Sequence, residues 1–349
     1  MKHAFYQRGF TLIEIMVAML LGVFLLGGIL QVFLHSKQTY RTQEALSRLQ
    51  EDGRFAMDFL IRDIRMAGFM GCSSQTAPAS TLSASTDFLY RFDKAIEGFE
   101  STSATAWTPA KDPSITSPLG GSDIISIRRV DDQSFTVTAQ TSSTDGLTLD
   151  SSATTTNLKA AGFLKNTPTG GNNCAIALVT DCSMAAIFQV SGIAGTVLTH
   201  AKDGACTPKN ALDNLGRTYI RAQVYSLSTI SYYVGENPNN QPALYTKKGA
   251  KAEEMVEGIE QMQILYGVNT DASADGTPNY YVTADKVKDS DWPKVMSVRI
   301  SLLVVSIDNN LTDKPISYTY NGHLVQPDKD DRRLRKIFTS TIALRNRLS

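Results

Sequence analysis

Few side chains in this sequence have the type and spacing for chemistry, and the most unusual is Glu14. It lies in the run GFTLIEIMVAMLLGVFLLGGILQVFL at residues 9–34, where only Thr11 and Gln31 are also clearly polar. A charged residue at the centre of a membrane helix costs about 2.5–3.5 kcal/mol on insertion scales, and less near the interface. Glu14 therefore either lies near the interface and reaches water, or is retained for a partner. We favour the interpretation that Glu14 is retained for a partner.

Four cysteines form the second candidate set: Cys72, Cys174, Cys182 and Cys206. All follow the apolar run, in the part of the chain that we expect to be exported, where disulfides persist. The segment between Cys174 and Cys182 contains no Gly or Pro, and as a strand it would hold these cysteines roughly 26 Å apart, beyond disulfide reach. The other two pairings remain open, and we favour Cys72–Cys182 with Cys174–Cys206. Zinc is disfavoured because neither a C-x-x-C pair nor a histidine cluster is present.

Other signals for catalysis or ligand binding are weak. The four histidines are scattered, and no G-x-S-x-G, Walker or dinucleotide-binding motif occurs in the sequence. A loop with Asp271 and Asp275 could hold calcium, but it lacks the EF-hand spacing and the final glutamate, so a plain turn is the better interpretation. We therefore predict no enzymatic activity, no cofactor and no metal site. Lys+Arg and Asp+Glu both total 34, which gives no reason to expect a nucleic-acid binder.

The apolar run has the length of a membrane-spanning helix. Residues 10–34 would cover roughly 37 Å, enough for a hydrocarbon core of about 30 Å with some tilt. Lys2 and Arg8 precede the run, so the positive-inside rule keeps the leader in the cytoplasm and exports everything after the run. A secretory signal peptide would have a shorter apolar core and a small-residue cleavage site, which is absent here. Ala18 and Gly22 give a weak indication of close helix packing.

The residues around Gly9 resemble a known processing signal. Lys2 and Arg8, followed by Gly9 and then Phe10-Thr11-Leu12-Ile13-Glu14 at the start of an apolar helix, look like the class III signal of type IV pilins and their relatives. The resemblance implies that a prepilin peptidase cuts between Gly9 and Phe10 and methylates Phe10. It also implies that Glu14 neutralises the terminal amine of a neighbouring subunit during assembly. A carboxylate and an ammonium in a low-dielectric site are more stable as a pair than alone.

The sequence after residue 34 predicts that the helix continues into water as far as about residue 70. Apolar and small residues recur there at spacings of three and four, which indicates one buried face: Leu46, Leu49, Gly53, Ala56, Leu60, Ile64 and Ala67. Glu44–Arg48 and Asp58–Arg62 are spaced as favourable helix pairs. Gly53 is expected to weaken the helix by up to about 1 kcal/mol relative to Ala.

The remainder predicts an α+β fold, with this long N-terminal α-helix packed on a mostly antiparallel β-sheet head. Residues 72–121 are expected to be mainly loop, with only 87–92 compact. Short β-prone runs follow, and we expect strands at 123–130, 134–139, 174–180, 186–190, 196–200, 220–234, 262–268, 295–307, 316–320 and 336–344. Residues 249–258 are expected to form a short helical turn.

Five further segments resemble PilW-type minor pilins: 61–72, 181–190, 256–268, 292–306 and 332–348. This resemblance implies a low-abundance subunit that joins other minor pilins and the major pilin, primes pilus assembly and lies at the tip, often with a large adhesin-like partner. Its location would be the inner membrane, with a single pass and a periplasmic head, and then the pilus. The alternatives are a J-class pseudopilin of type II secretion and an exported binding protein that uses the helix only as an anchor.

These expectations divide the chain into four regions. They are a leader at 1–9, a transmembrane and filament-core helix at 10–34, the soluble half of the helix at 35–70, and a β-rich head at 71–349. Within the head, acidic residues at 328–331 adjoin basic residues at 332–336. This charge run is either a docking edge for a neighbouring subunit or a solvated loop that enters the last strand.

Overall fold

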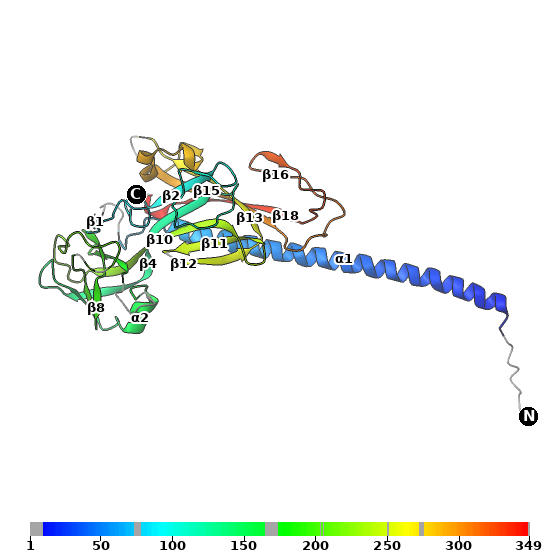
Figure 1. Cartoon of the computed structure of the whole chain (residues 1–349), viewed down its shortest axis with the longest axis horizontal. Helices are drawn as coiled ribbons and strands as arrows, with labels where there is room; N and C mark the ends of the chain where they lie inside the picture. Colours follow the sequence, from blue (N-terminus) through cyan, green and yellow to red (C-terminus); the bar gives the residue numbers. More distant parts are fainter. Residues whose placement is uncertain are drawn as a thin grey trace, which may run out of the picture.

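The structure, a computed structural model, describes residues 10–72, 78–164, 174–202, 204, 206–249, 251–271 and 276–347. A long helix, α1 (Leu12–Arg65), projects from a β-rich head (Figure 1). At its start the side chain of Thr11 accepts a hydrogen bond from the backbone N–H of Glu14, as in a helix N-cap. The helix ends at Arg65, a few residues before the predicted end, and Gly68 then turns the chain with a φ of +77°.

The head contains two main β-sheets and a small hairpin. The larger sheet has the order β1-β7-β6-β10-β4-β5-β9-β8, with β11 and β12 extending from β10, and β2 and β3 extending from β4. The smaller sheet has the order β14-β13-β15-β18, and β16 pairs with β17. Among the described strand pairs only β1 and β7 are parallel. The predicted fold class, a long N-terminal helix on a mostly antiparallel head, is therefore confirmed.

The strands of the larger sheet are β1 (Ala79–Ser80), β2 (Ile96–Ser101), β3 (Trp107–Thr108), β4 (Ile124–Ala139), β5 (Leu147–Leu149), β6 (Ile176–Thr180), β7 (Ala185–Gln189), β8 (Gly192–Ala194), β9 (Val197–Thr199), β10 (Gln223–Glu236), β11 (Pro242–Lys248) and β12 (Lys251–Glu257). The other strands are β13 (Ile259–Val268), β14 (Tyr280–Val282), β15 (Val295–Val305), β16 (Tyr318–Tyr320), β17 (His323–Val325) and β18 (Arg335–Ala343). The short helices are α2 (Thr155–Ala160), η1 (Ala284–Lys286), η2 (Asp289–Lys294) and η3 (Arg345–Arg347).

Two large hydrophobic cores organise the head, and the long strands β4 and β10 contribute to both. One core combines the buried face of α1 with β4, β10, β13 and β15. The other lies in a region that we call the distal lobe, the described residues between 131 and 222, and includes Phe135, Phe163 and Phe188. Figure 1 shows this lobe, with α2 and β8, at the end of the molecule remote from the N-terminus.

The soluble half of α1 packs on the smaller sheet and on β12 through most of the predicted face. Leu49, Ala56, Leu60, Ile64 and Ala67 are buried there. Leu46 is 41% exposed, so its predicted burial is wrong. In that turn the helix instead directs Thr42 and Ala45 inward, and the Thr42 hydroxyl donates a hydrogen bond of 3.2 Å to the Leu311 carbonyl.

Gly53 lies where α1 comes closest to the sheet. A Cβ added at this position would lie 2.2 Å from the Phe338 ring. We expect Gly53→Ala to lower the free energy of unfolding of the head by about 1–3 kcal/mol through overpacking, although Ala is the better helix former by about 1 kcal/mol. Urea denaturation of the full chain in detergent measures this change. Gly27→Ala, where nothing lies within 4 Å of the added Cβ, is the control. Increased stability of the Gly53 variant would contradict the close packing.

Two segments of the head differ from the sequence predictions. Residues 249–258 contain β12 rather than a helical turn, because pairing with β11 satisfies backbone groups that so short a helix would leave open. The segment 72–121, expected to be mainly loop, contains the buried strand β2, which pairs with β4. The sequence analysis did not predict this strand because Glu97 and Gly98 are residues that strands disfavour. Glu97 is buried against Arg128 at 2.9 Å, and Gly98 makes room for the Tyr266 side chain.

Candidate functional site

The start of α1 contains the residues selected for processing and assembly. Phe10 is 79% exposed and Glu14 is also exposed, whereas Gly9 lies outside the described residues. The Thr11 hydroxyl donates a long hydrogen bond of 3.5 Å to the Glu14 carboxylate. No cation among the described residues forms an ion pair with Glu14. Within residues 10–72 and the other described ranges, this carboxylate therefore has no cationic partner and could pair with a group from another chain.

The membrane half of α1 is an apolar surface that the rest of the chain does not cover. Every residue from Phe10 to Leu34 is exposed. The helix is long and apolar enough to cross a membrane, and none of its most apolar stretch is buried. Nothing lies within 4 Å of a Cβ added at Gly22, Gly27 or Gly28. This surface requires lipid or other helices around it, because so large an apolar area is unfavourable in water.

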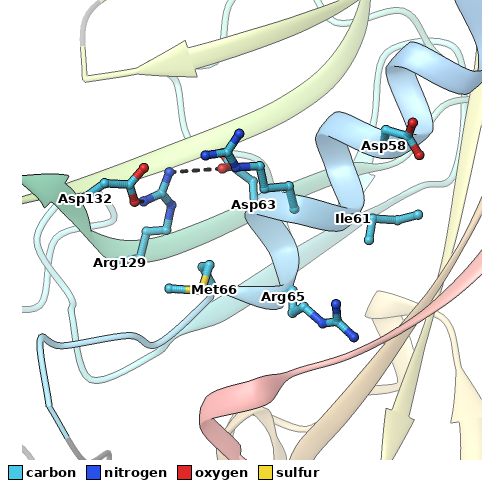
Figure 2. A pocket seen from close by; sticks show the side chains of 8 residues that line it. Asp58, Ile61, Asp63, Arg65, Met66, Arg129 and Asp132 are labelled. Atoms are coloured by element: carbon cyan, nitrogen blue, oxygen red, sulfur yellow. Dashed lines mark hydrogen bonds and ion pairs between the residues drawn. The ribbon is translucent and has the colours of Figure 1, made fainter.

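The other end of α1 is attached to the head by a partly buried polar network. The guanidinium of Arg129 on β4 forms an ion pair with Asp63 at 3.0 Å and with Asp132 at 3.1 Å. Figure 2 shows Arg129 reaching between these two carboxylates. The Tyr232 hydroxyl on β10 donates a short hydrogen bond to the second oxygen of Asp63. The network thus joins the last turn of the helix to the two central strands of the larger sheet.

The neighbouring carboxylates outweigh the effect of burial on the charge of Arg129. Burial alone would lower the pKa of Arg129, but the carboxylates of Asp63, Asp132 and Asp131 raise it above its usual value. Burial, with the charge of Asp63 as the next cause, raises the pKa of the Tyr232 hydroxyl far above its usual value. Arg129 therefore stays charged and Tyr232 stays protonated, as the hydrogen bond to the carboxylate requires. We interpret the network as the rigid joint between helix and head.

A surface cavity of about 470 Å³ borders this joint, and its lining includes Asp58, Arg62 and Arg65. Asp58 and Arg65 point away from the Arg129–Asp63 pair (Figure 2). The predicted pair Asp58–Arg62 is absent from the ion pairs of the described residues, whereas Glu44–Arg48 forms at 2.7 Å. Exposed helix pairs of this kind are worth only a few tenths of a kcal/mol, so the loss of one has little consequence.

Two disulfides link loops of the head. Cys72 is joined to Cys182, with their Cα atoms 5.2 Å apart, and Cys174 is joined to Cys206, with a Cα separation of 5.3 Å. This is the pairing favoured from the sequence. The first bond ties the chain that leaves α1 to the turn between β6 and β7. The second ties the start of β6 to the loop before β10, so both restrain the distal lobe.

An acidic pair, Glu100 and Asp123, lies between the two sheets. Asp123 accepts hydrogen bonds from the backbone N–H groups of Ser101 at 3.0 Å and Ile264 at 2.8 Å. Burial raises the pKa of Asp123 to about 6. Burial also raises the pKa of Glu100 to about 7, and the charges of Asp123 and Asp285 add to this shift. The sequence analysis did not identify this pair, because the residues are far apart along the chain and belong to no motif.

The acidic pair predicts a pH dependence of stability. Raised pKa values mean that the folded chain binds these protons more tightly than the unfolded chain, so the stabilisation is complete below about pH 4 and declines as pH rises to about 7. We expect a decline on the order of 3 kcal/mol. Glu100→Gln should flatten the profile measured by denaturation at several pH values, whereas the exposed control Asp93→Asn should not. An unchanged profile in Glu100→Gln would contradict this assignment.

The other candidate residues, those of the calcium loop and of the charge run, form no common site among the described residues. Asp275 of the calcium candidate lies outside the described residues, and Asp271 accepts a hydrogen bond of 2.9 Å from the Asn279 side chain. Within the described ranges no group of three or more His, Cys, Asp or Glu side chains could hold a metal ion. In the charge run, Arg333 and Arg335 form ion pairs with Asp331 and Glu260. These pairs stabilise the entry of the chain into β18.

Comparison with known families matches both ends of the chain. Residues 5–30 match the prokaryotic N-terminal methylation motif, and residues 231–346 match the family described as Type IV Pilus-assembly protein W. The two matches together support a PilW-type type IV pilin. Membership in this family implies membrane association, processing by a prepilin peptidase and contact with other pilus components.

The PilW match covers β13, β15 and β18 of the smaller sheet together with the strands β11 and β12. Of the PilW-like segments named above, 61–72 and 181–190 lie outside both matched ranges. Searches of curated proteins and of solved structures found no match. The family assignment therefore rests on the N-terminal motif and on the sheet that packs against α1.

Proposed function

We propose that this PilW-type pilin is a minor pilin that primes assembly of a type IV pilus and lies at or near the pilus tip. The peptidase would cut between Gly9 and Phe10 and methylate Phe10, and residues 10–34 would then join the filament core. The head would face the periplasm before assembly. The partners would be other minor pilins, the major pilin and a large tip adhesin.

The main support is the exposed apolar half of α1 with a single carboxylate near its start. Lipid can cover the apolar residues of this half, but an unpaired carboxylate in the hydrocarbon core costs about 2.5–3.5 kcal/mol. The amine of a neighbouring subunit's first residue would remove this cost by pairing with Glu14. Glu14 has no cation of its own among the described residues, which fits such an intermolecular role.

The shape of the head supports a terminal position. The distal lobe extends past the C-terminal end of α1, away from the membrane half (Figure 1). In a filament of stacked parallel helices, the space beyond this end would belong to the next subunit. A subunit with a large lobe there fits best where no subunit follows, which is the tip.

Deletion of the gene distinguishes a role in a type IV pilus from a role in type II secretion. We expect loss of surface fibres and of twitching, with both restored by the intact chain and neither restored by a chain without residues 10–34. Normal fibres together with failed exoprotein release would instead assign the chain to type II secretion. Normal fibres and normal release would contradict an assembly role and would favour an anchored binding protein.

A further inference from the structure

The strand β18 forms one edge of the smaller sheet, and its outer side is open. Among the described strands it pairs only with β15, in an unbroken register from Ser297–Ala343 to Val305–Arg335. No register shift interrupts this pairing, and the strand contains no proline. A regular edge of this kind is a ready template for another strand.

The hydrogen bonds that flank β18 show which of its groups face outward. The Leu344 N–H donates to the Met296 carbonyl, and the Ser306 N–H donates to the Leu334 carbonyl, each at 2.9 Å. Because hydrogen-bonded and non-bonded pairs alternate in an antiparallel ladder, the even-numbered residues of β18 bond to β15. The odd-numbered residues direct their N–H and C=O groups to the open edge: Arg335, Ile337, Thr339, Thr341 and Ala343. No described residue forms a backbone hydrogen bond with these groups.

The edge is accessible from solvent. The side chains of Thr339, Thr341 and Ala343 are exposed, and Ile337 is 38% exposed. The helix lies beside β18 in Figure 1, but it does not close over the strand, because the helix-facing residue Phe338 stays partly exposed. The exposure of these side chains indicates that the outward positions of β18 are accessible to an approaching strand.

Unpaired positive charge surrounds this edge. Lys336, Arg345 and Arg299 form no ion pair among the described residues. Lys336 lies over the Phe338 ring at 5.5 Å. Arg299 lies over the Tyr281 ring at 4.4 Å and donates a hydrogen bond of 3.3 Å to the Thr341 hydroxyl, so neither cation faces a carboxylate of the described residues. Two copies of β18 would bring like charges together, which destabilises a strand pair. An incoming strand with carboxylates would instead gain favourable contacts at both ends.

We propose that the outer edge of β18 binds an extended segment of a different protein chain, with β-prone residues at its centre and acidic residues near both ends. Backbone hydrogen bonds to the odd-numbered residues would supply affinity, and the cations near both ends would select the acidic partner. The proposal depends only on β18 and its neighbours. It therefore holds in a pilus and in a secretion system alike.

The test uses the full chain in detergent and a short blocked peptide in which Thr and Val alternate between Asp-Glu and Glu-Asp ends. The peptide should slow amide hydrogen exchange at Ile337, Thr339 and Thr341. A peptide with Lys in place of the acidic residues should bind at least about tenfold more weakly. Absence of slowing at roughly millimolar peptide, or equal binding of the Lys peptide, would overturn the proposal. Slowing that depends on protein concentration without peptide would also overturn it, because it indicates self-association.

Proline variants show whether the edge itself is the site. Thr339→Pro removes an outward N–H and leaves the ladder to β15 intact, as proline does on edge strands, and should weaken peptide binding at least about tenfold. Thr339→Val, which keeps the N–H, should bind normally, and Thr341→Pro provides a second outward variant. Unchanged binding in both proline variants would refute the assignment. Glu14→Ala should bind the peptide normally, so failure of the assembly role and failure of the edge are distinguishable.

Discussion

Asp63→Ala lowers the free energy of unfolding of the head by about 3 kcal/mol. The substitution leaves the partly buried guanidinium of Arg129 with Asp132 as its remaining ion-pair partner, and it removes the acceptor of the Tyr232 hydroxyl. Removal of one member of a buried ion pair costs about 3–5 kcal/mol, because the stranded charge loses water without compensation. The lower end of this range applies because Asp132 stays in place.

Urea denaturation followed by the fluorescence of Trp107 and Trp292 measures this loss, since both tryptophans are buried in the head. Asp58→Ala, at an exposed position five residues earlier in the same helix, should change stability by no more than about 0.5 kcal/mol. The double variant with Arg129→Ala should be more stable than the sum of the single effects predicts, because no stranded charge remains. A loss for Asp63→Ala as small as that for Asp58→Ala would contradict the role of the joint.

Glu14→Ala leaves processing intact and lowers the amount of this subunit in sheared pili at least tenfold. Without the carboxylate, the terminal amine of the neighbouring subunit would have no partner in a low-dielectric site. A loss of about 1.4 kcal/mol at this contact already changes the equilibrium tenfold, and the cost of a stranded charge exceeds that value. Glu14→Gln, which keeps the size of the side chain, should show the same defect.

Immunoblots of sheared pili and of membranes measure incorporation and total amount in parallel. Glu44→Gln is the matched control, because Glu44 is an exposed glutamate of the same helix, outside the apolar half, and pairs with Arg48. Glu44→Gln should be incorporated normally. Normal content of both Glu14 variants in pili would show that the carboxylate is dispensable for assembly.

The features that could be predicted from the sequence are local ones. The apolar helix and the buried face at Leu49, Leu60 and Ile64 follow from helical periodicity. The strand β15 follows from the alternation of apolar residues at Val298, Ile300, Leu302 and Val304, and the structure places it between β13 and β18 in the smaller sheet. These signals lie within one element, so no knowledge of distant contacts is needed to find them.

The features that were missed depend on contacts between distant segments. The strand β12 has a helix-favouring sequence, and only its partner β11 makes it extended. In the sequence, Gly53 is only a residue that weakens a helix. In the structure, a glycine is needed there because the Phe338 ring, far along the chain, leaves no room for a Cβ. The Asp63–Arg129 joint and the Glu100–Asp123 pair likewise join residues from different elements. No spacing rule within one segment could have found them.

The most direct test of the assembly account is the mass and N-terminal sequence of the protein recovered from membranes, with and without the prepilin peptidase. The account predicts a mature chain that begins with methylated Phe10 and appears only when the peptidase is present. An intact Met1 in the presence of the peptidase, or a cut beyond Leu34, would contradict it. Either result would mean that residues 10–34 serve only as an anchor or a signal and not as a filament helix.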